Sequence, residues 1–184
     1  NIVSNVIQGF EGTTFVPANW SLFNPNNNVS WIRKAPGKGS DFAAFIDNYN
    51  NNTINQLDML QAPPVRTTGA DSLTITFDLA HKDYPGSFDR LRVLASKDCG
   101  VTFTSLYSKS GPTLATAGNS VDDFTDPTQY EWRKETVGVS TGFVAGSNNI
   151  IIQLENRNDF GNNIFIDNFI RRDLTINSGQ FHEL

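Results

Sequence analysis

The segment 162–170, NNIFIDNFI, places a single carboxylate, that of Asp167, inside a run of isoleucine and phenylalanine. If the segment is a strand, alternation gives one face Ile164, Ile166, Asn168 and Ile170 and the other face Phe165, Asp167 and Phe169. A carboxylate without a partner in such apolar surroundings is costly. The pattern therefore predicts that a cation or a set of hydrogen-bond donors meets Asp167. The metal-free alternative is a side-chain cap on a bulge or strand end.

Candidate catalytic groups are few. The chain has two histidines, His81 and His182, and none of the motifs H-E-x-x-H, G-x-S-x-G or G-x-x-x-x-G-K-[ST]. A Ser–His–Asp site built on His81 stays open, but no serine is marked as its partner. The 19 acidic residues would allow a glycosidase pair almost anywhere, so their number favours nothing. We therefore expect no enzyme and no catalytic residue, and a polysaccharide lyase or hydrolase is the last of three possibilities.

The segment SKDCGVTF, residues 96–103, fits the pattern Ser-x-Asp-x-Gly-x-Thr-aromatic of an Asp-box. This pattern predicts a tight hairpin in which Asp98 accepts hydrogen bonds from the turn, Gly100 takes a positive φ and Phe103 packs beneath. Asp-boxes of sialidase-like propellers come in several copies, whereas this chain has one. We interpret the segment as a self-capped turn. Cys99 at its centre has no histidine near it in the sequence and is a poor nucleophile.

Composition limits the class of protein and its partners. The 184 residues, 38% of them hydrophobic, suit a single globular domain over 1–184. A net charge of −5 with scattered basic residues disfavours nucleic acid, and the apolar runs are too short for membrane insertion. The single cysteine excludes an internal disulfide. Because the chain starts abruptly at Asn1, we expect a piece of a larger protein.

The elements that must position these groups are strands. Alternation of apolar and polar residues recurs in 72–80 and 88–96, while no stretch carries a helical apolar period. Turn-forming clusters of Asn, Gly, Pro and Asp separate the strands and could also form a binding surface. The sequence therefore predicts an all-β antiparallel sandwich or jelly roll. Further strands are expected at 3–9, 19–23, 29–33, 42–47, 101–108, 131–139, 149–155 and 163–171.

Taken together, the chain resembles the MAM-like, cleaved-adhesin and choice-of-anchor jelly rolls of secreted Bacteroidetes-type proteins, including the adhesin domains of gingipain-type proteases. Each motif is weak by itself, and their common order over nearly the whole chain carries the resemblance. In chain order they are GFEG (9–12), PANW (17–20), NP (24–25) with Trp31, FIDNYN (45–50), LQAP (60–63) in place of the commoner L-x-[ST]-P, LTITFD (73–78), SKDCGVTF (96–103), LYSKSG (106–111), WRKETV (132–137), and GNN (161–163) followed by IDN (166–168).

The resemblance implies a two-sheet jelly roll similar to carbohydrate-binding modules, with the first and last strands side by side. It also implies a structural calcium ion between the F-E near the start and the I-D-x near the end, so Glu11 and Asp167 are its expected ligands. Calcium prefers several carboxylate and carbonyl oxygens, which agrees with the need of Asp167 for a cation. Asp47 and Asp41 are weaker candidate ligands. The resemblance further implies a secreted or cell-surface location.

We therefore expect a non-catalytic, calcium-stabilised binding or adhesion module, with a glycan or extracellular protein as ligand and neighbouring domains of a parent chain as partners. Aromatic rings beside polar loops are the platforms on which such folds bind sugars. Trp31, Tyr49, Tyr84 and Phe160 are the candidates, and ordinary packing is the alternative for each of them. Trp20 and Trp132 are expected in the core. A purely structural accessory domain that stabilises or docks a protease or glycosidase domain is the second possibility.

Overall fold

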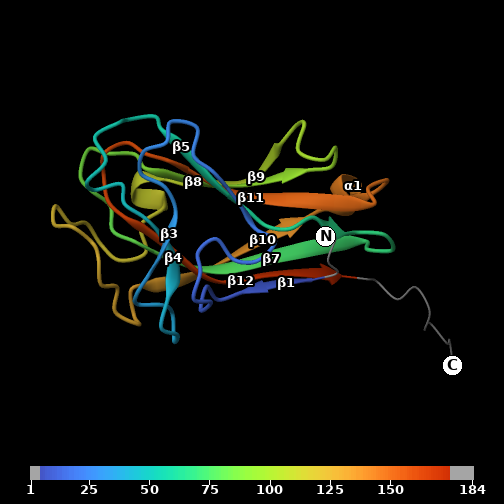
Figure 1. Ribbon diagram of the computed structural model, residues 1–184, viewed down its shortest axis with the longest axis horizontal. Coiled ribbons are helices and arrows are strands. Elements are labelled where there is room, and N and C mark those ends of the chain that lie inside the picture. The colour runs from blue at the N-terminus through green and yellow to red at the C-terminus, as the bar shows by residue number, and fades with distance from the viewer. Residues whose placement is uncertain (1–4, 175–184) are drawn as a thin grey trace, which may run out of the picture.

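The structure is a computed structural model that describes residues 5–174 (Figure 1). Two antiparallel sheets face each other, which confirms the predicted β-sandwich. The first, the β7 sheet, has the order β10 (Trp132–Val139), β7 (Ser72–His81), β12 (Ile164–Leu174), β4 (Ala43–Ile46) and β3 (Ile32–Lys34), with β1 (Val6–Gln8) also paired to β12. The second, the β11 sheet, has the order β2 (Ser21–Phe23), β5 (Leu57–Gln61), β11 (Asn149–Arg157), β8 (Arg90–Ser96) and β9 (Thr104–Ser110), with β6 (Val65–Arg66) paired to β11.

The main core lies between the two sheets, and the predicted alternation supplies it. In β7 the side chains of Leu73, Ile75, Phe77 and Leu79 are fully buried, while Thr74 and Thr76 point outward. The expected strands appear close to their predicted places, but β5 and β6 were not predicted. A short 3-10 turn (Gly111–Thr113) and the four-residue helix α1 (Thr141–Val144) are the helical pieces of the described chain.

The face assignment along β12 changes at a bulge. The pairing of β12 with β7 shifts register between Asp167 and Ile170, and Asn168 adopts a positive φ of 49°. Because of the extra residue, Phe169 follows Ile164 and Ile166 into the main core. The prediction that Ile170 shares their face, and that Phe169 shares the face of Phe165, is therefore wrong beyond the bulge.

A second, smaller apolar cluster covers the outer face of the β7 sheet. Phe165 stacks there against Phe45 at a centroid distance of 4.8 Å and meets Trp132 at 6.1 Å. Phe124, from the connection between the 3-10 turn and β10, closes over Phe165 at 5.9 Å. Trp132 is thus buried as expected, and so is Trp20, which meets Phe169 edge to face in the main core.

The first and last strands lie side by side, as predicted. Val6 pairs with Arg171 and Gln8 with Phe169 in the β1–β12 ladder. The start of β1 consequently lies beside the end of β12, and the long loops gather on the opposite side of the molecule (Figure 1). Among the described residues no helix is long and apolar enough to cross a membrane.

The 96–103 segment forms the hairpin turn that the Asp-box predicts. Asp98 accepts a hydrogen bond from the Thr102 amide at 2.9 Å, and Ser96 Oγ donates to Asp98 Oδ1 at 2.7 Å. Hydrogen bonds from Thr102 and Ser96 hold the pKa of Asp98 down at about 2. Gly100 takes a φ of 88°, and Cys99 is exposed at the tip. The hydrogen bonds of the Asp98 carboxylate therefore stabilise the turn itself.

Candidate functional site

Asp167 is met by the loop between β3 and β4. Its Oδ2 accepts hydrogen bonds from the Lys38 amide at 2.7 Å and from Ser40 Oγ at 2.6 Å. Its Oδ1 accepts from the Asn168 amide at 2.6 Å. Glu11, in the loop after β1, binds the same β3–β4 loop through the Phe42 amide at 3.0 Å. The structure thus brings the two principal predicted calcium ligands to one loop.

Oxygen atoms converge beside Gly37 in this loop. A Cβ at position 37 would clash with Ser40 Oγ and with the carbonyl oxygen of Phe42, and would lie 2.8 Å from Asp167 Oδ2. Only glycine fits here, and the space that it leaves is lined by a hydroxyl, a carbonyl and a carboxylate. Burial raises the pKa of Asp167, and the nearby charge of Glu11 raises it further. The oxygens present suit calcium, which would relieve both effects, but three hydrogen-bond donors already meet the carboxylate at the β12 bulge, as the metal-free alternative expects.

The two weaker candidate ligands, Asp41 and Asp47, lie on different loops. Asp41 is exposed on the β3–β4 loop. Asp47 follows β4 at its other end, where its carboxylate accepts hydrogen bonds from the amide and side chain of Asn50 at 3.0–3.1 Å. Within residues 5–174 no group of three or more His, Cys, Asp or Glu side chains could hold a metal. A cation at Asp167 would depend on two carboxylates and neutral oxygens.

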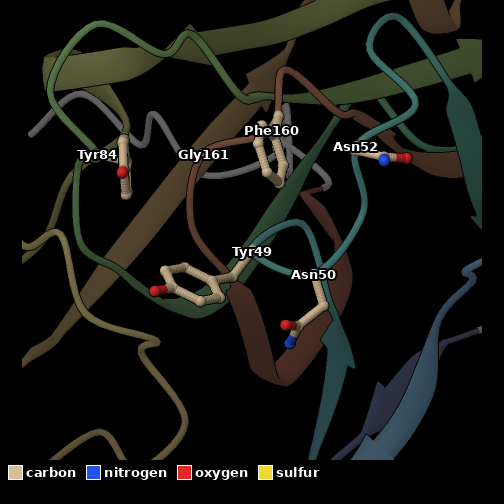
Figure 2. Close-up of a pocket in the computed structure, with 6 residues that line it drawn as sticks. All are labelled: Tyr49, Asn50, Asn52, Tyr84, Phe160 and Gly161. Atoms are coloured by element: carbon tan, nitrogen blue, oxygen red, sulfur yellow. The ribbon is translucent and has the colours of Figure 1, made fainter.

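A pocket of about 380 Å³ opens among the loops at the end of the sandwich away from β1. Figure 2 shows the rings of Tyr49, Tyr84 and Phe160 around this hollow, while the side chain of Asn52 extends away from the rings. Asn50, Asn52 and Gly161 complete the lining. The Tyr49 and Tyr84 rings stand edge to face, 6.3 Å apart at 63°. Tyr49 Oη donates to the carbonyl of Val121 at 3.2 Å, which fixes its ring.

Phe160 is held in the pocket wall by its loop. The Asp89 carboxylate is buried and accepts hydrogen bonds from the amides of Asp159 and Asn162, each at 2.7 Å. Phe160 adopts a φ of 55° between them and is 51% exposed. Gly161 packs so tightly on Asp89 and Ser87 that a Cβ there would overlap both side chains. The ring is therefore presented to solvent by a fixed backbone.

Of the four aromatic residues proposed as ligand-binding, the structure brings three into this pocket and leaves one out. Tyr49, Tyr84 and Phe160 come from three separate loops. Trp31 lies in the core with 1% exposure, and its indole donates to the carbonyl of Asp58 at 3.1 Å. A buried indole offers no face to a ligand, so packing accounts for Trp31. Asn50, Asn52 and Gly161 were not singled out, although the asparagine-rich run 49–53 marked a polar loop.

The histidine candidate for catalysis is inside the protein. His81 has 1% exposure, and its Nδ1 lies 3.0 Å from the carbonyl oxygen of Asn163. Burial lowers its pKa to about 4. Such an imidazole is neutral near pH 7 and does not reach the pocket as a lining residue. His182 lies outside the described residues.

No protein-family model matches the chain, and no curated protein matches it at a significant level. Among solved structures, the K1 cleaved adhesin domain of Lys-gingipain from Porphyromonas gingivalis W83 is similar with a TM-score of 0.66 and 16% identity, over 93% of this chain and 99% of that one. The K3 domain of the same protein is similar with a TM-score of 0.64 and 18% identity, over 90% of this chain and 97% of that one. The CBM27-1 module of Caldicellulosiruptor saccharolyticus, solved with mannohexaose, is similar with a TM-score of 0.56 and 15% identity. The match covers 95% of this chain and 100% of that one.

These likenesses extend over nearly the whole of each chain at low identity. They agree with the antiparallel two-sheet architecture of this chain. The chain therefore has the jelly-roll β-sandwich fold that the cleaved adhesin domains of Lys-gingipain share with carbohydrate-binding modules.

Proposed function

We propose that this chain is a non-catalytic binding module of a secreted or cell-surface protein, and that the pocket of Tyr49, Tyr84 and Phe160 takes a glycan. The observation that carries the proposal is the arrangement of three partly exposed rings around a hollow whose lining also includes Asn50 and Asn52. Sugar rings stack on aromatic faces, and amides bond hydroxyl groups. A glycan-bound module among the solved relatives supports the choice of ligand class.

The fixed geometry of the pocket favours binding over mere packing. The Tyr49 hydroxyl is tied to Val121, and the Phe160 loop is tied to Asp89, so two of the three rings are oriented before any ligand arrives. Preorganised side chains cost little entropy on binding. The same loop end also carries other exposed apolar side chains, such as those of Phe88 and Val121. An extracellular protein is the alternative ligand for this surface.

The proposal is tested with a glycan array and a pull-down on insoluble polysaccharides. For a glycan that binds, Tyr84→Ala and Phe160→Ala should each weaken binding about tenfold, roughly 1.4 kcal/mol, because each removes a stacking surface. Tyr130→Ala is the matched control, since Tyr130 is 97% exposed and lies outside the pocket. Uniformly negative arrays would contradict the glycan proposal and would favour a purely structural accessory domain that stabilises or docks a neighbouring enzyme domain.

We further propose that calcium binds at Glu11 and Asp167. Support comes from the convergence of both carboxylates on the β3–β4 loop and from the oxygen-lined space beside Gly37. Glu11 follows β1 and Asp167 lies in β12, so an ion there would fasten the first strand to the last and stabilise the fold. Its role would be structural, with no part in any reaction.

A further inference from the structure

The loops around the aromatic pocket carry an unusual share of the negative charge. The segments 47–52, 83–89, 119–130 and 158–163 contain seven of the 19 acidic residues and no lysine, arginine or histidine. The rest of the chain therefore has 12 acidic residues against all 14 basic ones. The excess of negative charge in this protein is concentrated at the end that holds the pocket.

These carboxylates stand next to the pocket-lining residues or are bonded to them. Asp83 directly precedes Tyr84, and Asp159 directly precedes Phe160. Asp47 binds the side chain of the lining residue Asn50 at 3.0–3.1 Å. Asp122 follows Val121, whose carbonyl accepts the hydrogen bond of Tyr49. Charges act over about 10 Å at 0.1 M salt and farther below it, so low salt favours any effect of these carboxylates on a ligand.

Two basic side chains, those of Lys82 and Arg157, directly precede two of these segments. Lys82 pairs with Glu131 at 2.6 Å and stands 5.0 Å from the centre of the Phe124 ring. Arg157 donates to Asn55 Oδ1 and to the carbonyl of Phe88. Neither residue lines the pocket. Because Glu131 balances Lys82, only Arg157 of these two stands against the seven carboxylates of these segments, and their net charge is negative.

We infer that the pocket selects glycans that carry protonated amino groups, such as glucosamine units with a free amine, over neutral or acidic glycans. This inference rests on the proposed function and adds the ligand's charge to it. Rings of Tyr49, Tyr84 and Phe160 attract an ammonium through their π faces, since such cations bind within about 6 Å of a ring centre. The surrounding aspartates raise the local concentration of a cationic ligand and repel uronates.

The test is calorimetry with three soluble tetrasaccharides: β-1,4-linked glucosamine, the same tetramer fully N-acetylated, and tetragalacturonate. The first two have the same sugar backbone, with free amines in one and neutral acetylated amines in the other, and the salt dependence isolates the effect of charge. At about pH 6.5 and about 20 mM salt, we expect the glucosamine tetramer to bind about fivefold tighter than its acetylated form, and tetragalacturonate to bind weakest. At about 0.5 M salt the preference should largely disappear, because screening shortens the reach of the charges to a few ångströms.

Two charge variants separate the pocket from the rest of the surface. Asp122→Asn should reduce the preference about twofold, because Asp122 is exposed beside the pocket. Asp71→Asn is the matched control and should leave it unchanged, since Asp71 stands before β7 while Tyr84 follows that ten-residue strand.

The calorimetric results separate the preference for amino groups from glycan binding as such. If both glucosamine forms bind equally, or if a neutral glycan of the array binds while the amine tetramer does not, the inference is overturned and the glycan proposal stands. Tighter binding of tetragalacturonate also overturns it. If neither these tetramers nor any arrayed glycan binds, both proposals fail together.

Discussion

Burial shifts the protonation of two side chains in opposite directions. Asp58 is fully buried, and its Oδ2 accepts a hydrogen bond from Gln56 at 2.8 Å, whereas its Oδ1 has no hydrogen-bond partner within the described part of the chain. Burial raises the pKa of Asp58 to about 6 and lowers that of His81 to about 4. Near pH 7 Asp58 is therefore ionised at a cost to folding, and His81 is neutral.

The Asp58 pKa predicts how stability changes with pH. Because the folded pKa is about 6 and the unfolded value is lower, the folded state binds the proton more tightly, and stability rises as the pH falls through 6 toward 4. Asp58→Asn is neutral throughout and should lack this rise. In urea unfolding, wild type should gain about 2 kcal/mol more than Asp58→Asn between about pH 7.5 and about pH 4.5.

His81 is present in both proteins, so its opposite effect cancels in the comparison. Parallel stability curves for wild type and Asp58→Asn would show that burial does not raise the pKa of Asp58.

At the scale of elements, most strands could be predicted from the sequence, whereas the irregularity within a strand, the bulge of β12, could not be assigned from it. The apolar alternation of 72–80 and 163–171 predicted β7 and β12 because side-chain period follows directly from strand geometry. A bulge at Asp167–Asn168 was one of the two alternatives for this stretch, but the sequence could not decide for it, since the Asn168 side chain is held by the Lys38 carbonyl and Asp78, which come from remote segments. Only tertiary contacts decide where such a residue enters the strand.

The same limit applies to the candidate site. Trp31 and Phe160 both lie beside polar loops in the sequence, so both looked available to a ligand. Which ring is covered depends on how the loops fold over the open end of the sandwich. The loop of Phe160 is turned outward by the buried Asp89, a residue with no marked pattern around it. The asparagine-rich run 49–53 was the one sequence signal for the amide side of the pocket.

The tight packing of the Phe160 loop predicts the effect of one methyl group. Gly161→Ala should lower the free energy of unfolding by about 1–3 kcal/mol, because the added Cβ overlaps Asp89 and Ser87. It should also weaken any ligand that needs the Phe160 ring. Gly142→Ala in α1 is the control, since nothing lies within 4 Å of the position that a Cβ would take there and alanine suits a helix. Equal stability of the two variants in urea would contradict the proposed packing.

On the scale of the whole molecule, the two candidate sites lie at different places, and we propose different purposes for them. The cation site joins the loop after β1, the β3–β4 loop and the bulge of β12. The pocket is formed by loops at the far ends of β4, β7 and β11. A cation at the first site would fasten β1 to β12 and leave the proposed ligand surface at the pocket free.

Removal of calcium is therefore expected to change stability without changing the pocket. A chelator should lower the melting temperature by roughly 5–10 °C if calcium is present at about 100 times its dissociation constant, since that saturation stabilises by about 2.7 kcal/mol. Asp167→Asn should abolish the response to added calcium. Asp47→Asn is the control and should keep it, because Asp47 closes a turn at the other end of β4. An unchanged melting temperature and no bound ion would contradict the calcium proposal.

The pairing of the first and last strands also determines how the domain would carry mechanical force. β12 shares nine register pairs with β7, and β1 shares three with β12. Tension carried from the C-terminal end of β12 to a ligand at the opposite end of the sandwich would run along the strands and load the hydrogen bonds of the long ladder together. Tension applied across the two chain ends would instead open the short β1–β12 ladder one bond at a time. The domain should thus be strong when pulled by its ligand and weak when pulled apart by its ends.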